Sequence, residues 1–565
     1  MNHSCAHLMA QAVKHLYPEA KFWVGPVIEE GFYYDMDLGN KVLTEEDLGK
    51  IEKEMKKISK DGKRIVRHEI SKAEALEMFK NDPYKVDLIE NMGDDEVISC
   101  YTQGDFTDLC RGPHVDTVKE LKYFKLLKFS GAYYKGDAKN KMLQRIYGVC
   151  FKSEEDLNKH LEELEEAKQR DHRKLGKDLG IFMFDNLVGK GLPMWLPNGF
   201  IVRRALVDYI MDKEIALGYL HVMTPSLGNV DLYKTSGHWD HYKDDMFPQM
   251  ELDDEAYVLR PMNCPHHMVM FRSKLHSYRD LPVRIAEIAN DFRYEASGAV
   301  CGIERTRAFT QNDSHIFCRP DQIEAEVKGV IDLILDVYKD FGFKDYKFRL
   351  SLRDVNNQEK YFGNDELWTK SEDALRNILK NTGALYYEAE GEAAFYGPKI
   401  DVQVRSAIGH DVTLSTRFEL EYINEEGEKV RPVVIHRAIL GSLDRFIAFL
   451  LEETKGVLPL WLAPVQVNII PVNNEYHLEY AKEIRDLLVR NHIRVNLDDR
   501  SEKLGYKLRE AVMKKTLYNV VLGDKEINSK EISYRMYGSS ETTTVSQSDF
   551  VKLITDEIAS RTLNK

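Results

Sequence analysis

The chain contains few cysteines and no pairing pattern among them. Seven stand at positions 5, 100, 110, 150, 264, 301 and 318, and none belongs to a Cys-x-x-Cys spacing. An odd number without close pairs argues against a disulfide framework, so we expect a reducing, cytoplasmic location. No apolar run approaches the roughly 20 residues of a membrane-spanning helix. The first residues predict an amphipathic helix, not a signal peptide, and no membrane association is expected.

An excess of positive charge is also missing. The 79 lysines and arginines are outnumbered by 93 acidic residues, which gives a net charge of -14. Proteins that bind nucleic acids are usually basic, so composition alone does not predict RNA binding. The shares of 43% apolar and 30% charged residues are typical of a globular protein. The length of 565 residues exceeds what one hydrophobic core holds and predicts three or four domains.

The pattern of predicted elements changes along the chain and indicates an α+β multidomain protein. Residues 1–152 mix one helix with short strands. Residues 153–180 predict one highly charged helix whose narrow apolar stripe suits a solvated connector. Residues 181–462 predict antiparallel strands with covering helices. In residues 463–565 strands and helices alternate, which predicts a small α/β domain with a mostly parallel sheet.

A lone cysteine, Cys264, lies in "RPMNCPHH". It could be a packed apolar side chain, a nucleophile, or one ligand of a metal whose other ligands are distant in sequence. Packing is the commonest fate of an isolated cysteine. The local sequence does not decide between these three possibilities.

Histidines and a cysteine recur at a spacing of four near the N-terminus. His3 and His7 stand on one face of a predicted helix. Cys110 and His114 have the same spacing in "DLCRGPH". Together the four side chains could bind zinc, or they could activate water by acid–base chemistry. A surface histidine pair beside an unrelated turn is the third interpretation.

Charged side chains flank a predicted loop in "FRYEASG" and "ERTRAFTQNDSHIF". Arg293 and Glu295 alternate along one predicted strand, and Arg305 and Arg307 along the next, so each pair should share a face. Guanidinium groups fixed on a sheet suit the phosphates of a nucleotide, and Phe309 could stack on its base. Ordinary salt bridges between strands are the alternative.

The order of three segments resembles the motifs of class II aminoacyl-tRNA synthetases. They are a strand ending at Pro225, the segment "FRYE", and "GSLDR", which we expect to place Gly441 and Arg445 on a helix. "NHSCAH", "GPVIEEGFYYD", "DLCRGPHV", "RPMNCPHH", "FTQNDSHIF", "AFYGPKID" and "RPVVIHRAILGS" are similar to bacterial threonyl-tRNA synthetases, and the similarity covers nearly the whole chain.

The resemblance implies a class II antiparallel core, an N-terminal α+β editing domain and a C-terminal α/β anticodon-binding domain. It implies a homodimeric ligase that joins L-threonine to tRNA(Thr) with ATP and hydrolyses mischarged seryl-tRNA(Thr). An impaired synthetase-like protein that still binds tRNA and edits is the alternative. A further alternative is a non-enzymatic regulator that binds RNA hairpins.

The resemblance also implies roles for individual residues. One zinc ion per subunit would hold the amino and hydroxyl groups of threonine and exclude valine, which an apolar pocket separates from threonine poorly. Serine also has a hydroxyl group and would be accepted at the zinc site, so seryl-tRNA requires editing. In this family the editing site works without a metal. Magnesium accompanies ATP. The implied zinc ligands are Cys264, His315 and His436; the catalytic residues are Arg293 and Arg445; the threonine and ATP contacts are Met262, Glu295, Arg305, Phe309, Gln311, Asp313, Tyr396, Lys399 and Thr416; the editing residues are His3, His7, Tyr34, Lys85, Asp108, Cys110 and His114; the anticodon contacts are Glu526 and Arg535.

The sequence departs from the family in two places. The given sequence begins at the motif, without the small domain that usually precedes "HSCAH", and a loss of that domain should spare both active sites. In addition, "VTLST", ending at Thr416, continues directly into "RFELEY", where the family has a longer strand. Either Glu419 and Glu421 substitute for the missing side chains, or the floor of the synthetic site is damaged.

Overall fold

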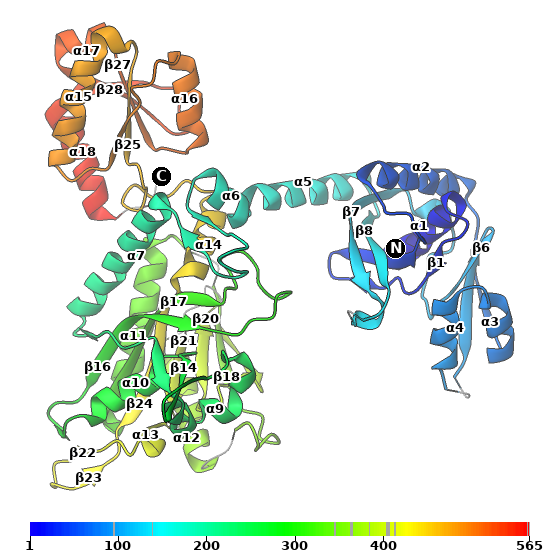
Figure 1. Cartoon of the computed structure of the whole chain (residues 1–565), viewed down its shortest axis with the longest axis horizontal. Coiled ribbons are helices and arrows are strands. Elements are labelled where there is room, and N and C mark those ends of the chain that lie inside the picture. The colour runs from blue at the N-terminus through cyan, green and yellow to red at the C-terminus, as the bar shows by residue number, and fades with distance from the viewer. Residues whose placement is uncertain are drawn as a thin grey trace. The chain divides into compact units, whose positions relative to one another are not determined.

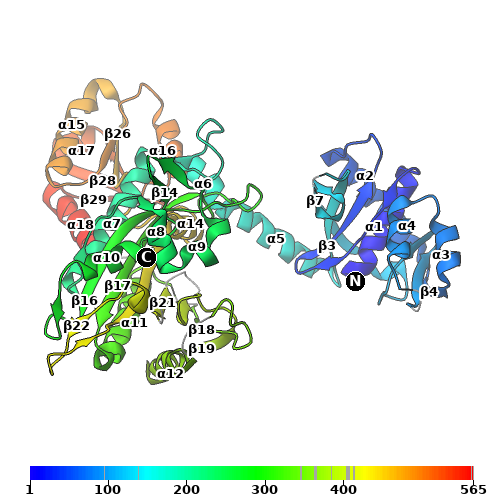
Figure 2. The ribbon, with the colours of Figure 1, turned by 60° about the horizontal axis from the view of Figure 1, so that its bottom comes forward.

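The computed structural model describes the chain except residues 94–95, 138, 344–345, 362–364, 383–384, 403–406, 412–413, 562 and 564–565. Contacts divide the chain into two compact units, Met1–Ala167 and Lys168–Lys565, which are described separately below. Figures 1 and 2 show the elements of each unit. None of the described helices is both long and apolar enough to cross a membrane.

The N-terminal unit is built around helix α1 (Asn2–Leu16), which lies inside the fold. Its residues from Ser4 to Val13 are all buried, more than an amphipathic surface helix would bury. The helix packs against β3 and β8 of an antiparallel sheet and against α2. That sheet contains β1 (Lys21–Phe22), β2 (Val27–Ile28), β3 (Gly31–Asp37), β7 (Tyr123–Tyr133) and β8 (Met142–Phe151); a second sheet contains β4 (Ile65–Ile70), β5 (Ile98–Gln103) and β6 (Phe106–Leu109); the other helices are α2 (Glu45–Asp61), α3 (Lys72–Phe79) and α4 (Pro83–Glu90).

The predicted charged helix is two helices, α5 (Glu154–Arg170) and α6 (His172–Asp178). The start of α5 is as predicted, because the Ser153 hydroxyl accepts the Asp156 N–H and donates to the Asp156 carboxylate. At Asp171 the backbone leaves the helical region (φ -52, ψ 119), and its carboxylate caps α6. The prediction of one helix was wrong because α6 turns to pack against α14.

The second unit contains a large sheet of eight described strands in the order β11-β16-β17-β24-β21-β20-β18-β19. Five of the seven neighbouring pairs are antiparallel, which confirms the predicted antiparallel core. The strands are β11 (Leu220–His221), β16 (Val283–Phe292), β17 (Ala308–Cys318), β18 (Phe348–Leu352), β19 (Tyr386–Glu390), β20 (Lys399–Val402), β21 (Ala407–Asp411) and β24 (Val433–Ser442).

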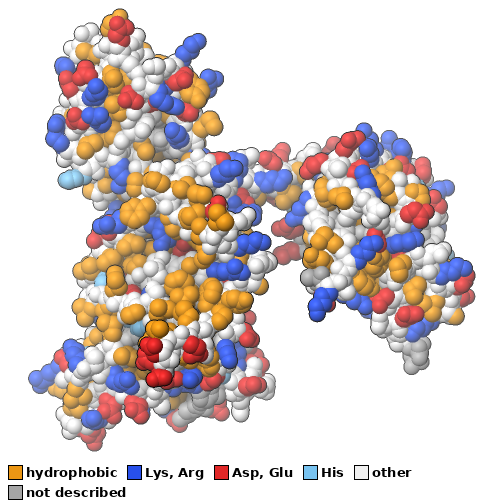
Figure 3. Space-filling view, viewed as in Figure 1, with side chains coloured by type: hydrophobic (Ala, Val, Ile, Leu, Met, Phe, Trp, Pro, Cys, Tyr) orange, Lys and Arg blue, Asp and Glu red, His pale blue; other side chains and the backbone are white. Residues whose placement is uncertain are grey.

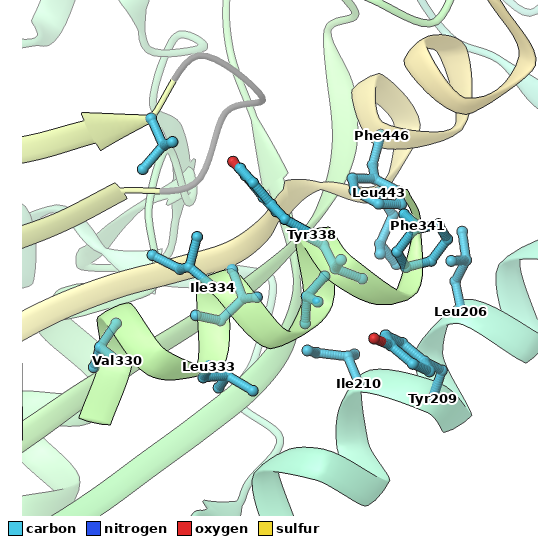
Figure 4. Packing of buried hydrophobic residues seen from close by; sticks show 14 of the residues in the cluster. Leu206, Tyr209, Ile210, Val330, Leu333, Ile334, Tyr338, Phe341, Leu443 and Phe446 are labelled. Atoms are coloured by element: carbon cyan, nitrogen blue, oxygen red, sulfur yellow. The ribbon is translucent and has the colours of Figure 1, made fainter. Parts of the chain in front are cut away.

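Three helices pack against this sheet and form its main hydrophobic core. They are α7 (Pro197–Ala216), α11 (Ile323–Asp340) and α14 (Leu443–Glu453). Figure 4 shows Leu206 and Ile210 facing side chains of the other two helices. Each fully buried side chain of this size contributes about 1.5–3 kcal/mol. The helices α11 and α14 of this layer pack on the neighbouring strands β17 and β24, which carry the site residues described below.

Smaller elements surround the sheet. They are α8 (Val230–Ser236), α9 (His238–His241), α10 (Cys264–Arg272), α12 (Asp365–Thr382), α13 (Leu414–Arg417), β9 (Phe182–Met183), β10 (Met194–Trp195), β12 (Leu227–Asn229), β13 (Met250–Leu252), β14 (Glu255–Leu259), β15 (His276–Ser277), β22 (Tyr422–Ile423) and β23 (Lys429–Val430).

The last hundred residues form the predicted small α/β domain. Its sheet has the order β26-β25-β27-β28-β29. Two of its four strand pairings are parallel, so the sheet is mixed, less parallel than predicted. The elements are β25 (Val467–Pro471), α15 (Asn474–Arg490), β26 (Val495–Leu497), α16 (Leu504–Met513), β27 (Tyr518–Leu522), α17 (Asp524–Ser529), β28 (Glu531–Met536), β29 (Thr543–Ser546) and α18 (Gln547–Ser560).

Candidate functional sites

His3, His7, Cys110 and His114, the N-terminal cluster, come together from two segments distant in sequence. Their potential ligand atoms all lie within 4.8 Å of one another. Helix α1 presents the first two histidines one turn apart, and β6 leads directly into Cys110. The Cys110 Sγ lies 3.1 Å from His3 Nε2 and 3.1 Å from His114 Nε2. The two pairs with i, i+4 spacing, His3 with His7 and Cys110 with His114, therefore meet at one place in the fold.

Behind the N-terminal cluster lies a buried group of Tyr34, Lys85 and Asp108. The Lys85 Nζ is 2.5 Å from Asp108 Oδ1 and 3.0 Å from the Tyr34 hydroxyl, which donates to the same carboxylate. All three residues are at most 3% exposed. The Asp108 Oδ2 is 3.9 Å from His7 Nε2. A carboxylate at this distance can orient the imidazole and stabilise its protonated form.

Burial keeps the N-terminal cluster uncharged near neutral pH. It lowers the pKa of His7 to about 4. Burial, with the neighbouring His7 and His3, lowers the pKa of His114 to about 3. Burial also raises the pKa of the Cys110 thiol to about 11. Neutral imidazoles can accept a proton from water, whereas a protonated thiol is a weak nucleophile. A cavity of about 360 Å³ beside His3, His7 and Cys110 gives a substrate access.

Cys264, His315 and His436 form a second group, the strand cluster. In the pairing of β17 with β24, His315 stands directly opposite His436, and His315 Nε2 is 2.9 Å from His436 Nδ1. Helix α10 begins at Cys264 and brings its sulfur to the same point, so that the ligand atoms lie within 4.8 Å of one another. All three residues are at most 7% exposed. Buried cysteine and histidine side chains form a donor set that zinc prefers.

A cavity of about 200 Å³ opens beside the strand cluster. The Tyr396 ring stacks on the His436 ring with centroids 4.8 Å apart. The Lys399 ammonium donates to Asp401 at 3.0 Å. Burial raises the pKa of Asp313 well above its ordinary value. The predicted residues that line the cavity are Met262, Cys264, Arg293, Gln311, Asp313, Tyr396, Lys399 and His436.

Arg293 borders the same cavity and carries an unsatisfied donor. Its guanidinium lies 5.1 Å from the Phe309 ring and 5.7 Å from the Tyr242 ring. Its Nε is buried and has no hydrogen-bond partner within the described part of the chain. Buried polar groups are usually paired, so this donor at the border of the cavity is available to an anionic group of a ligand.

The arginines near "FRYE" are not on strands, contrary to prediction. Strand β16 ends at Phe292 and β17 begins at Ala308, so Arg293, Glu295 and Arg305 lie in the connecting loop. The ladder stops because the intervening segment turns, with Gly302 at φ +46. The loop still brings charges together, since Arg305 Nε donates to Glu295 at 2.8 Å.

The third motif is divided between a strand and a helix. Gly441 lies near the end of β24 with φ +61, a conformation that favours glycine, so the prediction of a helical Gly441 was wrong. Arg445 lies on α14 as predicted, and its Nε donates to the Glu304 carbonyl at 2.6 Å. Gly441 still pairs with Asn312 of β17, next to the irregularity where the register of the two strands shifts, and α14 begins two residues later.

Thr416 does not reach the cavity. It lies exposed on the short helix α13, and the residues that precede this helix, 412–413, lie outside the described residues. Glu419 is exposed with φ +52, and the Glu421 carboxylate binds Lys429 at 3.0 Å. Neither acid lines the cavity, so the structure does not support the first of the two alternatives, in which these acids substitute for the missing side chains.

Several residues of the site escaped the sequence analysis. Asn263, Asp291, Asp401 and Arg437 also line the cavity. Arg437 follows His436 on a strand, and strict alternation would put it on the opposite face. Asn263 could have been found, because it precedes the first residue of the strand cluster directly.

Glu526 and Arg535 lie together in the C-terminal domain. The Glu526 carboxylate accepts the Ser533 hydroxyl at 2.6 Å and caps α17 through the Gly523 N–H at 2.9 Å. Ser533 and Arg535 are two residues apart on β28, so they share one face. Arg535 is exposed. Figure 3 shows acidic and basic side chains intermingled on the visible face of this domain.

Comparisons with protein families match three stretches of the chain. Residues 247–454 match the tRNA synthetase class II core domain (G, H, P, S and T). Residues 466–557 match an anticodon binding domain. Residues 98–147 match the second additional domain of threonyl and alanyl tRNA synthetases.

Individual proteins are similar over nearly the whole chain. A threonine–tRNA ligase of Staphylococcus epidermidis is 56% identical over 568 residues, which cover 99% of this chain and 88% of that protein. A threonine–tRNA ligase of Staphylococcus carnosus has the same identity and coverage. A crystal structure of the RNA binding domain of threonyl-tRNA synthetase from Cryptosporidium parvum is 35% identical with a TM-score of 0.65, and the match covers 70% of this chain and 99% of that one.

Proposed function

The chain belongs to the threonine–tRNA ligase family, and from this premise we propose which of its residues perform each step of the family's reaction. The enzyme activates L-threonine with ATP, which is used with magnesium, and transfers it to the 3′ end of tRNA(Thr). Its second additional domain edits mischarged seryl-tRNA(Thr). We propose domain limits of 1–152 for editing, 153–180 for the connector, 181–462 for catalysis and 463–565 for anticodon binding.

Cys264, His315 and His436 hold one zinc ion per subunit in this proposal. The residues fit the ion: they are buried, their ligand atoms lie within 4.8 Å, and both histidines can present a nitrogen lone pair. When bound, zinc supplies a coordination position for the amino and hydroxyl groups of threonine. Valine has no hydroxyl, so such a site separates the two amino acids far better than an apolar pocket does.

Threonine occupies the cavity beside the strand cluster in this proposal, and ATP meets it at Arg293, which borders the cavity. Arg293 binds the α-phosphate and the threonine carboxylate, and its unpaired buried Nε is the observation that carries this role. Arg305 and Arg445 bind the outer phosphates of ATP. Glu295 contacts the adenine amine, and Phe309 stacks on the adenine base. Met262, Gln311, Asp313, Tyr396 and Lys399 contact threonine and the nucleotide.

Editing takes place at the N-terminal cluster by acid–base chemistry. His3 and His7 take a proton from the attacking water, and Cys110 and His114 orient it. Tyr34, Lys85 and Asp108 fix the position of His7. The low pKa of about 4 for His7 supports this role, because its imidazole stays neutral at physiological pH.

Two further assignments complete the proposal. Glu526 and Arg535 contact the anticodon. The first motif forms a homodimer, supported by Leu220 and Met223, which are 60% and 93% exposed. Light scattering at micromolar concentration should give a dimer, and a monomer would contradict this. The composition supports the cytoplasm as the location.

One experiment tests the synthetic site directly. ATP–pyrophosphate exchange should proceed with threonine, more weakly with serine and hardly with valine. Equal exchange with threonine and valine would contradict recognition of the hydroxyl group at the strand cluster.

A further inference from the structure

A chain of buried hydrogen bonds lies behind the strand cluster. His315 Nδ1 is 2.8 Å from His267 Nδ1, and His267 Nε2 is 3.1 Å from Glu287 Oε2. The three residues are at most 2% exposed. They come from α10, β16 and β17, so tertiary structure alone brings them together. His267 and Glu287 have no role in the reaction as described above.

Only one arrangement of protons satisfies this chain when His315 binds a metal. Its Nε2 faces the other members of the strand cluster and must keep its lone pair, so its Nδ1 carries the proton. That proton is donated to His267 Nδ1. His267 then carries its own proton on Nε2 and donates it to Glu287.

Glu287, at the end of the hydrogen-bond chain opposite His315, is held in place by several donors. Glu287 Oε1 accepts the Thr224 N–H at 2.9 Å, and the Thr224 hydroxyl donates to Oε2 at 2.9 Å. The Arg260 guanidinium lies 3.3 Å from the same carboxylate. A charged acceptor held by these donors keeps the orientation of His267 constant.

We propose that His267 and Glu287 are positioning residues that hold His315 in the tautomer and orientation needed to bind zinc. This rests on the zinc site proposed above. A hydrogen-bond chain that ends in a carboxylate makes the metal-bound imidazole more basic and reduces its freedom to rotate, and loss of such partners typically costs about 10–100-fold in metal affinity.

The alternative is that His267 only fills space in the core. Three substitutions separate the possibilities. His267→Leu fills the space but breaks both hydrogen bonds. His267→Gln can accept from His315 and donate to Glu287 through its amide. Glu287→Gln removes the charge at the far end with little change in volume. His266→Gln is the matched control, because its ring faces the backbone of Leu227.

The experiment uses the full chain and measures zinc affinity by competition with a chromophoric chelator. The cobalt-substituted protein adds a visible spectrum that reports the ligand arrangement. We expect about 10–100-fold weaker zinc binding and an altered spectrum for His267→Leu. Glu287→Gln should weaken binding in the same direction, His267→Gln should recover part of the loss, and His266→Gln should stay within about twofold.

The outcomes separate this inference from the zinc site itself. If the unmodified chain binds no zinc, or if Cys264→Ala binds it fully, the zinc site is wrong. If the unmodified chain binds zinc and Glu287→Gln binds it equally well, the positioning role is overturned. Equal losses in His267→Leu and His267→Gln would also overturn it, since packing alone would then explain both. If His267→Leu does not fold, the zinc affinities of His267→Gln and Glu287→Gln decide whether His267 and Glu287 position His315.

Discussion

The two histidine–cysteine clusters use the same side chains in different surroundings. In the N-terminal cluster only His7 is fully buried, whereas all three members of the strand cluster are. Each cluster has a carboxylate nearby. The Asp108 carboxylate is bound by Lys85 at 2.5 Å, while Glu287 Oε2 lies 3.1 Å from His267 Nε2.

This difference shows that the surrounding residues decide the chemistry of a cluster. Both carboxylates are paired with a cation, Asp108 with Lys85 and Glu287 with Arg260, but only Glu287 lies within hydrogen-bond distance of a histidine, since Asp108 Oδ2 is 3.9 Å from His7 Nε2. Burial leaves the imidazole of His7 as a neutral base beside a cavity. In the strand cluster the carboxylate would support a zinc ligand through His267, as proposed above. Under the function proposed above, acid–base hydrolysis and metal binding belong to different units of one chain. Four experiments test this division, from the largest expected effect to the smallest.

Cys264→Ala should lose zinc and threonine activation together. Removing one of three protein ligands also removes the several kcal/mol that a bound metal supplies, so exchange should fall by about 10³-fold or more. Metal analysis and pyrophosphate exchange measure this. The control is Cys318→Ala, which removes a different buried cysteine and should leave the zinc content of the protein unchanged. Full zinc content in Cys264→Ala would move the metal to the N-terminal cluster and reverse the comparison.

Replacing both His3 and His7 with Ala should abolish hydrolysis of seryl-tRNA. General-base catalysis contributes about 10²–10⁴-fold, and threonine activation should stay nearly unchanged because the residues belong to another unit. Deacylation of preformed seryl-tRNA and threonyl-tRNA measures the effect. His15→Ala, a change at the far end of the same helix, is the control. Equal deacylation by the double variant and the unmodified enzyme would exclude this site.

Acid should loosen helix α1 through His7. Its pKa is about 4 in the folded protein against an ordinary value of 6.5 for a solvated histidine, so the unfolded state binds more protons between these values. The stability present above pH 6.5 is therefore lost as pH falls toward 4, at about 1.4 kcal/mol per pH unit from this group. Hydrogen exchange of α1 in the whole chain, corrected for intrinsic rates, measures this. His7→Gln should show a shallower pH dependence, and an identical slope would contradict the assignment.

Thr416→Ala should change threonine activation by less than about twofold, as is usual for exposed positions. Gln311→Ala, at a position that lines the cavity, should raise the KM for threonine clearly. Steady-state exchange kinetics compare the two variants. A large effect of Thr416→Ala would mean that α13 moves into the site on substrate binding.

Local sequence patterns predicted much of the fold. The alternation of strands and helices after residue 463 and the two long strands of the catalytic sheet were confirmed, because periodicity reports which faces are buried. The errors occurred where tertiary contacts override local preference. Asp171 breaks a charged helix so that α6 can pack on α14, and the loop after Phe292 leaves the ladder.

Sequence by itself determined the residue types of both clusters and, through spacing, that His3 and His7 share one face of a helix and that Cys110 and His114 have the same spacing. It also determined the family resemblance. Only the tertiary structure decided that His267 and Glu287 stand behind His315 and that Thr416 lies outside the cavity. The reason is physical. Spacing within one helix or strand fixes a face, but the register between β17 and β24, and the placement of α10 against them, depend on packing among residues far apart in the chain.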